Sequence, residues 1–197
     1  MTGFQRFPIS FARSVLVARI FLVVFFLLFS CPSHAQQDQF EKKEWAESHI
    51  TLLAPRDWQV LLEKSDDAPI CHISPEPIDA TTASYQVGLA INILRSVPST
   101  MGQKPSEYAQ SLIEQIRERS DQEITVQSTQ STLFKIYRVE YSLVTDDESM
   151  NIINILEAND STGTLYMMIW QAPESKAQSF SEMREKVLNS IHLDPAF

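Results

Sequence analysis

The sequence predicts an α+β domain in which a mostly antiparallel sheet of six to eight strands is covered by two helices. Two observations carry this prediction. Short apolar segments with period-two alternation recur between turns rich in Pro, Asp and Asn, as is typical of strands. Two other segments, after Pro105 and from Phe180 to Ile191, repeat apolar residues at helical spacing. No internal repeat, low-complexity segment or linker indicates a second domain.

The first 35 residues have the pattern of an export signal. Three arginines precede the apolar run 20–29, and the polar stretch that follows ends with the small residues Ser33 and Ala35. The run is too short to span a bilayer, which takes about 20 apolar residues. We therefore expect cleavage after Ala35, with an uncleaved anchor as the alternative. The expected organisation is a signal peptide (1–35), a short polar leader (36–47) and a single α+β domain (48–197).

Cys31 gives this segment a second interpretation. Residues 28–31 (LFSC) resemble a bacterial lipobox, in which the cysteine is lipidated and becomes the mature N-terminus. Phe29 departs from that pattern, because its position commonly holds a smaller side chain. Either interpretation predicts an extracytoplasmic protein, periplasmic or secreted, and lipidation would anchor it to a membrane. If Cys31 is removed, Cys71 has no disulfide partner within the chain and is either buried or an intermolecular thiol. Its apolar neighbours favour burial.

The exported part is acidic. Residues 1–35 hold three of the 16 Lys and Arg residues and none of the 25 Asp and Glu, so the remainder carries a formal charge of −12. This charge disfavours nucleic acid and anionic lipid headgroups as partners. It is compatible with a basic protein partner or with a solvated acidic surface that has no specific role.

Strands dominate the chain up to the central helix. Turn signals at 55–57, 64–69 and 75–77 separate the apolar segments. The expected strands are 50–53, 58–62, 70–74 and 84–97. The helix begins near Pro105, a residue suited to a first helical turn, and its apolar stripe comprises Tyr108, Leu112, Ile113 and Ile116.

The second half of the chain also consists of strands followed by a helix. We expect a weak strand at 124–129 and three further strands at 134–144, 150–156 and 165–170. A final helix follows. Ser179 and Glu182 have the spacing of a capping box at its start, in which each side chain would satisfy a free backbone amide.

The order of these elements resembles the PsbP/DcrB-like superfamily, which also includes a nuclear-import factor that binds the small GTPase Ran. The matching features are the Pro-x-x-Trp turn at 55–58, the helix after Pro105, the paired strands between Tyr137 and Trp170, and the segment 166–173 before the last helix. Members commonly end in a helix whose last turn reads Ile-x-x-Ser-Phe. Here Ile191 replaces the aromatic residue.

The resemblance covers residues 40–193 and implies a non-enzymatic protein-binding or assembly-accessory module. Such domains are often extracytoplasmic in bacteria, sometimes as lipoproteins. No set of ligand-binding residues follows from the fold, because members bind unrelated partners through different surfaces.

The residues themselves indicate no catalytic, cofactor or metal site. The four glycines form neither a nucleophile elbow nor a phosphate-binding loop. Cys71 and His72 are adjacent on a predicted strand, so their side chains should point to opposite faces. The remaining candidates for zinc, His49 and His192, have no paired short spacing. Two acidic clusters, Asp66-Asp67 and Asp146-Asp147-Glu148, lack the alternation of a calcium loop and are typical of hairpin tips.

One strand is unusually rich in aromatic residues and methionine. Its alternation places Tyr166, Met168 and Trp170 on one face, with Trp58 near the start of that strand, and Met167 and Ile169 on the other. Core packing explains this pattern, and a hydrophobic groove formed by Trp58, Tyr166, Met168 and Trp170 is the alternative.

We therefore expect an exported, non-enzymatic protein-binding or assembly-accessory module of the cell envelope, whose partner is another envelope or secreted protein. The alternative is a carrier of a small hydrophobic ligand or lipid that uses a cavity between sheet and helix.

Overall fold

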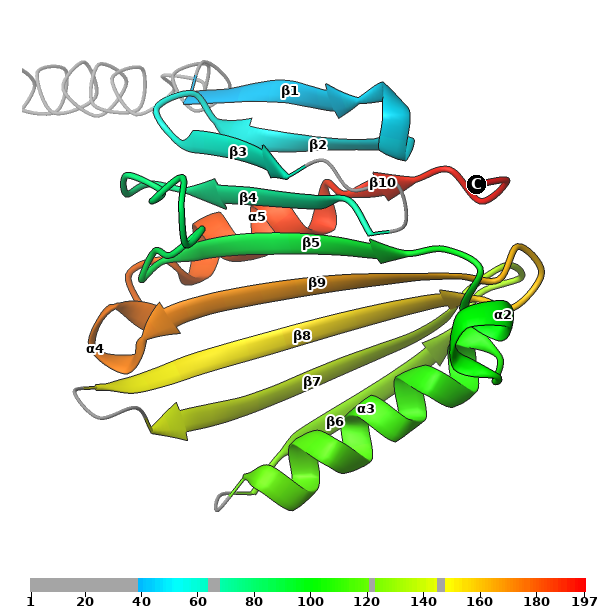
Figure 1. Cartoon of the computed structure of the whole chain (residues 1–197). Helices are drawn as coiled ribbons and strands as arrows, with labels where there is room; N and C mark the ends of the chain where they lie inside the picture. Colours follow the sequence, from blue (N-terminus) through cyan, green and yellow to red (C-terminus); the bar gives the residue numbers. More distant parts are fainter. Residues whose placement is uncertain (1–38, 64–67, 121–122, 145–147) are drawn as a thin grey trace, which may run out of the picture. The chain divides into compact units, whose positions relative to one another are not determined.

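A computed structural model describes residues 39–63, 68–120, 123–144 and 148–197. Its strands form two sheets, and every ladder between neighbouring strands is antiparallel (Figure 1). The large sheet has the order β3-β4-β5-β9-β8-β7-β6, with β3 Gln59–Glu63, β4 Ile70–Ser74, β5 Gly88–Leu94, β6 Thr125–Gln130, β7 Lys135–Val144, β8 Ser149–Asn159 and β9 Thr164–Pro173. The small sheet has the order β1-β2-β10, with β1 Phe40–Trp45, β2 Ile50–Pro55 and β10 His192–Leu193.

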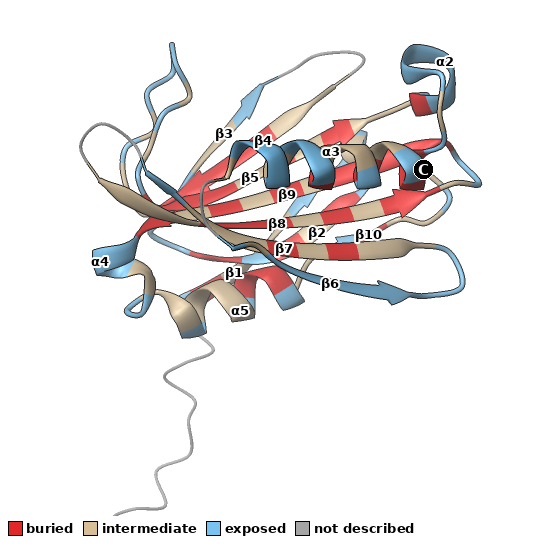
Figure 2. Ribbon diagram, turned by 90° about the horizontal axis from the view of Figure 1, so that it is seen from below, coloured by how far each residue is buried: buried red, intermediate tan, exposed pale blue. Residues whose placement is uncertain are grey.

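Helices lie on both faces of the large sheet (Figures 1 and 2). Helix α3 (Pro105–Arg119) packs on β7, β8 and β9, and α5 (Ser181–Asn189) lies on the opposite face, where it packs on β2. The shorter helices are η2 (Ala46–Ser48), α2 (Val97–Met101) and α4 (Glu174–Ala177). The predicted fold class, an antiparallel sheet covered by two long helices, is confirmed.

Two clusters of buried apolar side chains lie between these layers. The larger lies between the large sheet, the small sheet and α5, and the smaller lies between the large sheet and α3. Strand β9 contributes to both, because its alternate residues point to opposite faces. Tyr166, Met168 and Trp170 belong to the larger cluster and Leu165 to the smaller.

The N-terminal end of α3 is fixed to the turn between β8 and β9. One carboxylate oxygen of Asp160 accepts the Ser106 backbone N–H at 2.9 Å, and the other accepts the Ser106 hydroxyl at 2.8 Å. Lys135 donates to the same carboxylate at 3.1 Å. Burial opposes ionisation of Asp160, but the bonds from Ser106 and Lys135 outweigh it and hold the pKa of this carboxyl below its ordinary value.

Helix α5 begins without the predicted capping box. Its N-cap residue is Phe180, and the Ser179 hydroxyl donates to the Lys176 carbonyl at 2.7 Å instead of accepting a helix amide. The prediction was wrong because the preceding turn, α4, already supplies an acceptor for this hydroxyl. An ion pair of 2.9 Å between Arg138 of β7 and Glu185 ties the helix to the sheet.

Several boundaries differ from the sequence-based expectation. Residues 40–45, expected in a polar leader, form β1, whose Phe40 packs into the core beside β2. Strand β5 runs from Gly88 to Leu94, shorter at both ends than the expected 84–97. Its first residue must be glycine, because it has φ +155° and a Cβ there would clash with the Ile73 carbonyl oxygen. Helices α2 and α4 and strand β10 were not predicted.

The signal-peptide and lipidation predictions, including Cys31 and Ala35, lie outside the described residues. So do the acidic residues Asp66, Asp67, Asp146 and Asp147. Within the described part of the chain, no helix has both the length and the apolarity needed to cross a bilayer.

Candidate functional site: a cleft between the two sheets

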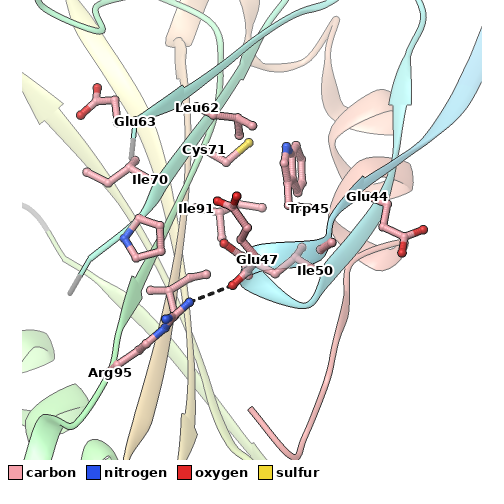
Figure 3. A pocket seen from close by; sticks show the side chains of 14 residues that line it. Glu44, Trp45, Glu47, Ile50, Leu62, Glu63, Ile70, Cys71, Ile91 and Arg95 are labelled. Carbon is pink, nitrogen blue, oxygen red and sulfur yellow. Dashed lines mark hydrogen bonds between the residues drawn. The ribbon is translucent and has the colours of Figure 1, made fainter. Parts of the chain in front are cut away.

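A cleft of about 690 Å³ lies between the small sheet and one edge of the large sheet (Figure 3). One wall is the end of β1 with η2 and the start of β2. The other wall comprises β3, β4 and the end of β5. Residues far apart in the sequence therefore line the same cleft, for example Trp45, Leu62 and Cys71.

The floor of the cleft is apolar. Ile50, Ile91 and Ile93 are each 1% exposed. Cys71 lies opposite Ile91 in the β4–β5 ladder, and Leu62 lies opposite Cys71 in the β3–β4 ladder, so these three side chains share one face. Leu62 stands at the open edge of this row, where 46% of it is exposed.

Three glutamates are among the lining residues: Glu44 and Glu47 come from the small-sheet wall and Glu63 from β3. The Glu63 carboxylate contacts His72 on the other face of the sheet, and Glu44 pairs with Lys42. Among the described lining residues Arg95 is the only basic one, and its guanidinium donates to the Glu47 backbone carbonyl at 3.0 Å, as the dashed line in Figure 3 shows. The same guanidinium stands 4.2 Å from the centre of the Phe197 ring. Arg95 is thus already held by two contacts within the protein.

The C-terminal segment braces the small-sheet wall. Phe197 stacks on the His49 ring with centroids 4.4 Å apart, and a carboxylate oxygen of Asp194 lies 3.0 Å from His49 Nδ1. A hydrogen bond from the Ala196 backbone, together with the His49 contact, lowers the pKa of Asp194. These contacts hold the loop between β1 and β2 beside Arg95.

Cys71 and His72 do not form a catalytic pair. Cys71 is buried, as predicted, and burial raises the pKa of its thiol far above the ordinary value, so the thiol stays protonated. His72 instead contacts Glu63, with 3.1 Å between Nε2 and Oε1, and meets the Tyr85 ring edge-on. Within the described residues no three His, Cys, Asp or Glu side chains gather in a way that could hold a metal ion.

The four residues considered for a hydrophobic groove meet in the core instead. Trp58 and Trp170 pack with ring centroids 5.9 Å apart, and Phe180 beside α5 covers Trp58. Tyr166, Met168 and Trp170 are at most 1% exposed and Trp58 is 6% exposed, so they leave no open surface for a ligand. Burial raises the pKa of Tyr166 to about 12.

The cleft itself was not found from the sequence. Its walls come from segments that pair only through the tertiary structure, and β1 was assigned to a leader. One usable signal was present: Leu62 is a large apolar residue followed directly by Glu63 at the end of a strand, next to a polar turn.

Comparison with known proteins agrees with this architecture. A family model for PsbP matches residues 40–193, from the first residue of β1 to the last of β10. The chain belongs to the PsbP family. The predicted resemblance to the PsbP/DcrB-like superfamily is confirmed, and the family match includes both sheets and the two long helices. Among curated proteins, no sequence matches this PsbP-family chain.

The fold recurs in a solved structure at low sequence identity. The solution structure of cyanobacterial PsbP (CyanoP) from Synechocystis sp. PCC 6803 is 12% identical, with a TM-score of 0.52 over 79% of this chain and 93% of that chain. LpqN of Mycobacterium tuberculosis, described as involved in cell envelope biogenesis, is also 12% identical, with a TM-score of 0.49 over 78% of this chain and 89% of that one.

Proposed function

We propose that this PsbP-family protein is an exported, non-enzymatic accessory module of the cell envelope that binds another envelope or secreted protein through the cleft between its sheets. The observation that carries the proposal is the cleft itself, whose apolar floor ends at the exposed side chain of Leu62. Such a surface suits an apolar anchor from a protein partner.

An extended segment is the form of partner that best fits this site. Strand β3 is the last strand of the large sheet on this side, so one of its edges makes no ladder hydrogen bonds within the described residues. An extended peptide that pairs with such an edge gains backbone hydrogen bonds, and its alternate side chains point into the neighbouring pocket. The segment should be basic, because Glu44 and Glu47 belong to the lining, whereas Arg95, the only basic residue of the described lining, already bonds the Glu47 carbonyl.

Crosslinking and co-purification of the natively processed protein, read by mass spectrometry, test the proposal with Leu62→Asp. This variant places a charge beside the apolar floor at a position already 46% exposed, so the fold should tolerate it. We expect Leu62→Asp to lower the recovery of a stoichiometric, basic partner about tenfold or more, because the variant loses one buried aliphatic contact.

Leu133→Asp is the matched control. Leu133 is 48% exposed and lies outside the cleft. Retention of the partner by this variant and its loss by Leu62→Asp would support the cleft as the binding surface. Equal capture by wild type and Leu62→Asp, or the absence of any stoichiometric partner, would reject the proposal.

Export is a separate part of the proposal and has its own test. The mass of the mature protein should correspond to a chain beginning at Gln36, after cleavage at Ala35, or to a chain beginning at an acylated Cys31. Cytoplasmic protein that retains residues 1–35 would contradict export.

A further inference from the structure

A second cavity, of about 350 Å³, lies beneath the C-terminal half of α3 (Figure 2 shows this helix on its face of the sheet). Its roof comes from Leu112 and Ile116, and its floor includes Leu156, Met167 and Ile169 from β8 and β9. The cavity is on the face opposite Trp58 and Trp170, and it shares no lining residue with the cleft between the sheets.

Two polar side chains converge in this apolar setting. Asn154 of β8 is 6% exposed, and its side-chain nitrogen donates to the Tyr141 hydroxyl oxygen at 3.2 Å. The Asn154 carbonyl oxygen, Oδ1, is buried without any hydrogen-bond partner. An unpaired buried acceptor is costly to a protein, so one that lines a cavity indicates a place for a donor from outside.

Tyr141 supplies the complementary group. Its oxygen accepts from Asn154, which leaves its own hydrogen available to donate. Burial raises the pKa of Tyr141, with the Asn154 bond opposing this shift, so the hydroxyl keeps its proton at neutral pH. The cavity therefore offers one free acceptor and one free donor next to each other.

We propose that this cavity binds a small neutral molecule with an apolar body and an amide group. The amide N–H would donate to Asn154 Oδ1, and the amide carbonyl would accept from the Tyr141 hydroxyl. A carboxylate has no hydrogen to give Asn154, and a cationic head would find no acidic residue in the described lining. The volume suits roughly a dozen non-hydrogen atoms, since a cavity of about 150 Å³ holds benzene.

This inference is independent of the proposed protein-binding function, because it concerns a different face of the sheet. The proposed ligand site uses Met167 and Ile169 of β9, which lie on the face opposite Tyr166 and Trp170.

Octanamide is the probe for the test. The natively processed protein, purified without detergent, is titrated with octanamide and followed by the NMR signals of Met167 and Ile169. We expect saturable binding with shifts confined to the cavity. Asn154→Leu should weaken it about tenfold or more, because this substitution removes the free acceptor while keeping a side chain of similar size.

Asn151→Leu is the matched control. Asn151 lies on the same strand and also has a buried carbonyl oxygen without a partner, but it does not line the cavity. The affinity of the Asn151→Leu variant for octanamide should stay within about twofold of wild type. Ile169→Trp, which fills the cavity, should abolish binding.

Three results would overturn the proposal. The first is no saturable octanamide binding to the wild-type protein. The second is unchanged affinity in Asn154→Leu. The third is tighter binding of octanoate than of octanamide, because this would place the head group at Arg119 on the rim of the cavity and not at the Asn154–Tyr141 pair.

Discussion

The two faces of the large sheet are built from alternate residues of the same strands, yet they are closed to different degrees. Toward α5 and the small sheet, β9 presents Tyr166, Met168 and Trp170, all at most 1% exposed. Toward α3 the same strand presents Leu165, which is fully buried, and then Met167 and Ile169, which are only half-buried. The first face is closed along its whole length, and the second is closed only near the start of α3.

The difference shows that burial is decided by the covering layer. Helix α3 crosses β7 to β9, and the cavity lined by Asn154 lies under its last turns. On the other face, α5 and the small sheet together cover the strand. The two faces should therefore respond differently to equivalent substitutions.

Truncation of neighbouring residues on β9 should give the largest effect. Trp170→Ala should lower the free energy of unfolding by about 3–5 kcal/mol, because it empties a fully enclosed volume beside Trp58. Ile169→Ala should cost about 1–2 kcal/mol, since part of its surface already meets solvent. Urea unfolding measures both, and equal losses would contradict the contrast between the faces.

The anchor of α3 should come next. Asp160→Ala removes the acceptor for Ser106 and Lys135, and we expect a loss of about 1–3 kcal/mol. Asp57→Ala, at an exposed turn position, is the control and should stay within about 0.5 kcal/mol.

Acid should weaken the same anchor. The pKa of Asp160 is lower in the folded protein than its ordinary value of 3.8, so the unfolded state takes up its proton first as the pH falls. The stabilisation that the Asp160 carboxylate provides is complete above its ordinary pKa, and it is lost as the pH falls through the lower pKa of the folded protein. The midpoint temperature of thermal unfolding should therefore decrease less steeply between pH 6 and pH 2 for Asp160→Asn than for wild type. An unchanged slope would show that the carboxylate contributes little.

The tie between α5 and the sheet should matter less. Glu185→Gln breaks the ion pairs with Arg138 and with Arg184 in the same helix. Glu185 and Arg138 are both partly exposed, at 39% and 27%. We expect a loss of up to about 1 kcal/mol. A double-mutant cycle with Arg138→Met isolates the Glu185–Arg138 pair. A coupling energy well above about 1 kcal/mol would mean that this pair stabilises the fold as much as Asp160 does at α3.

The smallest effect is expected at the open end of the α3 face. Leu143 is 46% exposed, and Leu143→Ser should change the free energy of unfolding by no more than about 0.5 kcal/mol. Val139 lies on the same face of β7 and is fully buried, so Val139→Ser should cost about 2–3 kcal/mol. Similar values from denaturant unfolding would mean that α3 protects both ends equally.

Period and turn chemistry were sufficient to predict most of the large sheet. Strand β4 was predicted with its observed bounds, and α3 begins at the predicted Pro105, where proline needs no amide partner. Strand β1 was missed because its sequence, FEKKEW, is mostly charged, and only its pairing with β2 buries Phe40. Strand β10 is two residues long and has no period to detect.

The sites were harder to predict for a related reason. Alternation separated the two faces of β9 correctly, but it does not say which face a helix covers completely. The aromatic residues suggested a groove, although large aromatic side chains contribute most when they are fully enclosed. The unpaired acceptor on Asn154 follows from three-dimensional neighbours and leaves no trace in the sequence.

The three strands of the small sheet also constrain the order in which the domain can assemble. The large sheet uses residues 59–173, whereas β2 pairs with β10 at residues 192–193, so the small sheet joins both ends of the domain. During synthesis the hairpin of β1 and β2 emerges before the strands of the large sheet and receives its third strand last. This long sequence separation makes closure of the small sheet a late and slow step of folding.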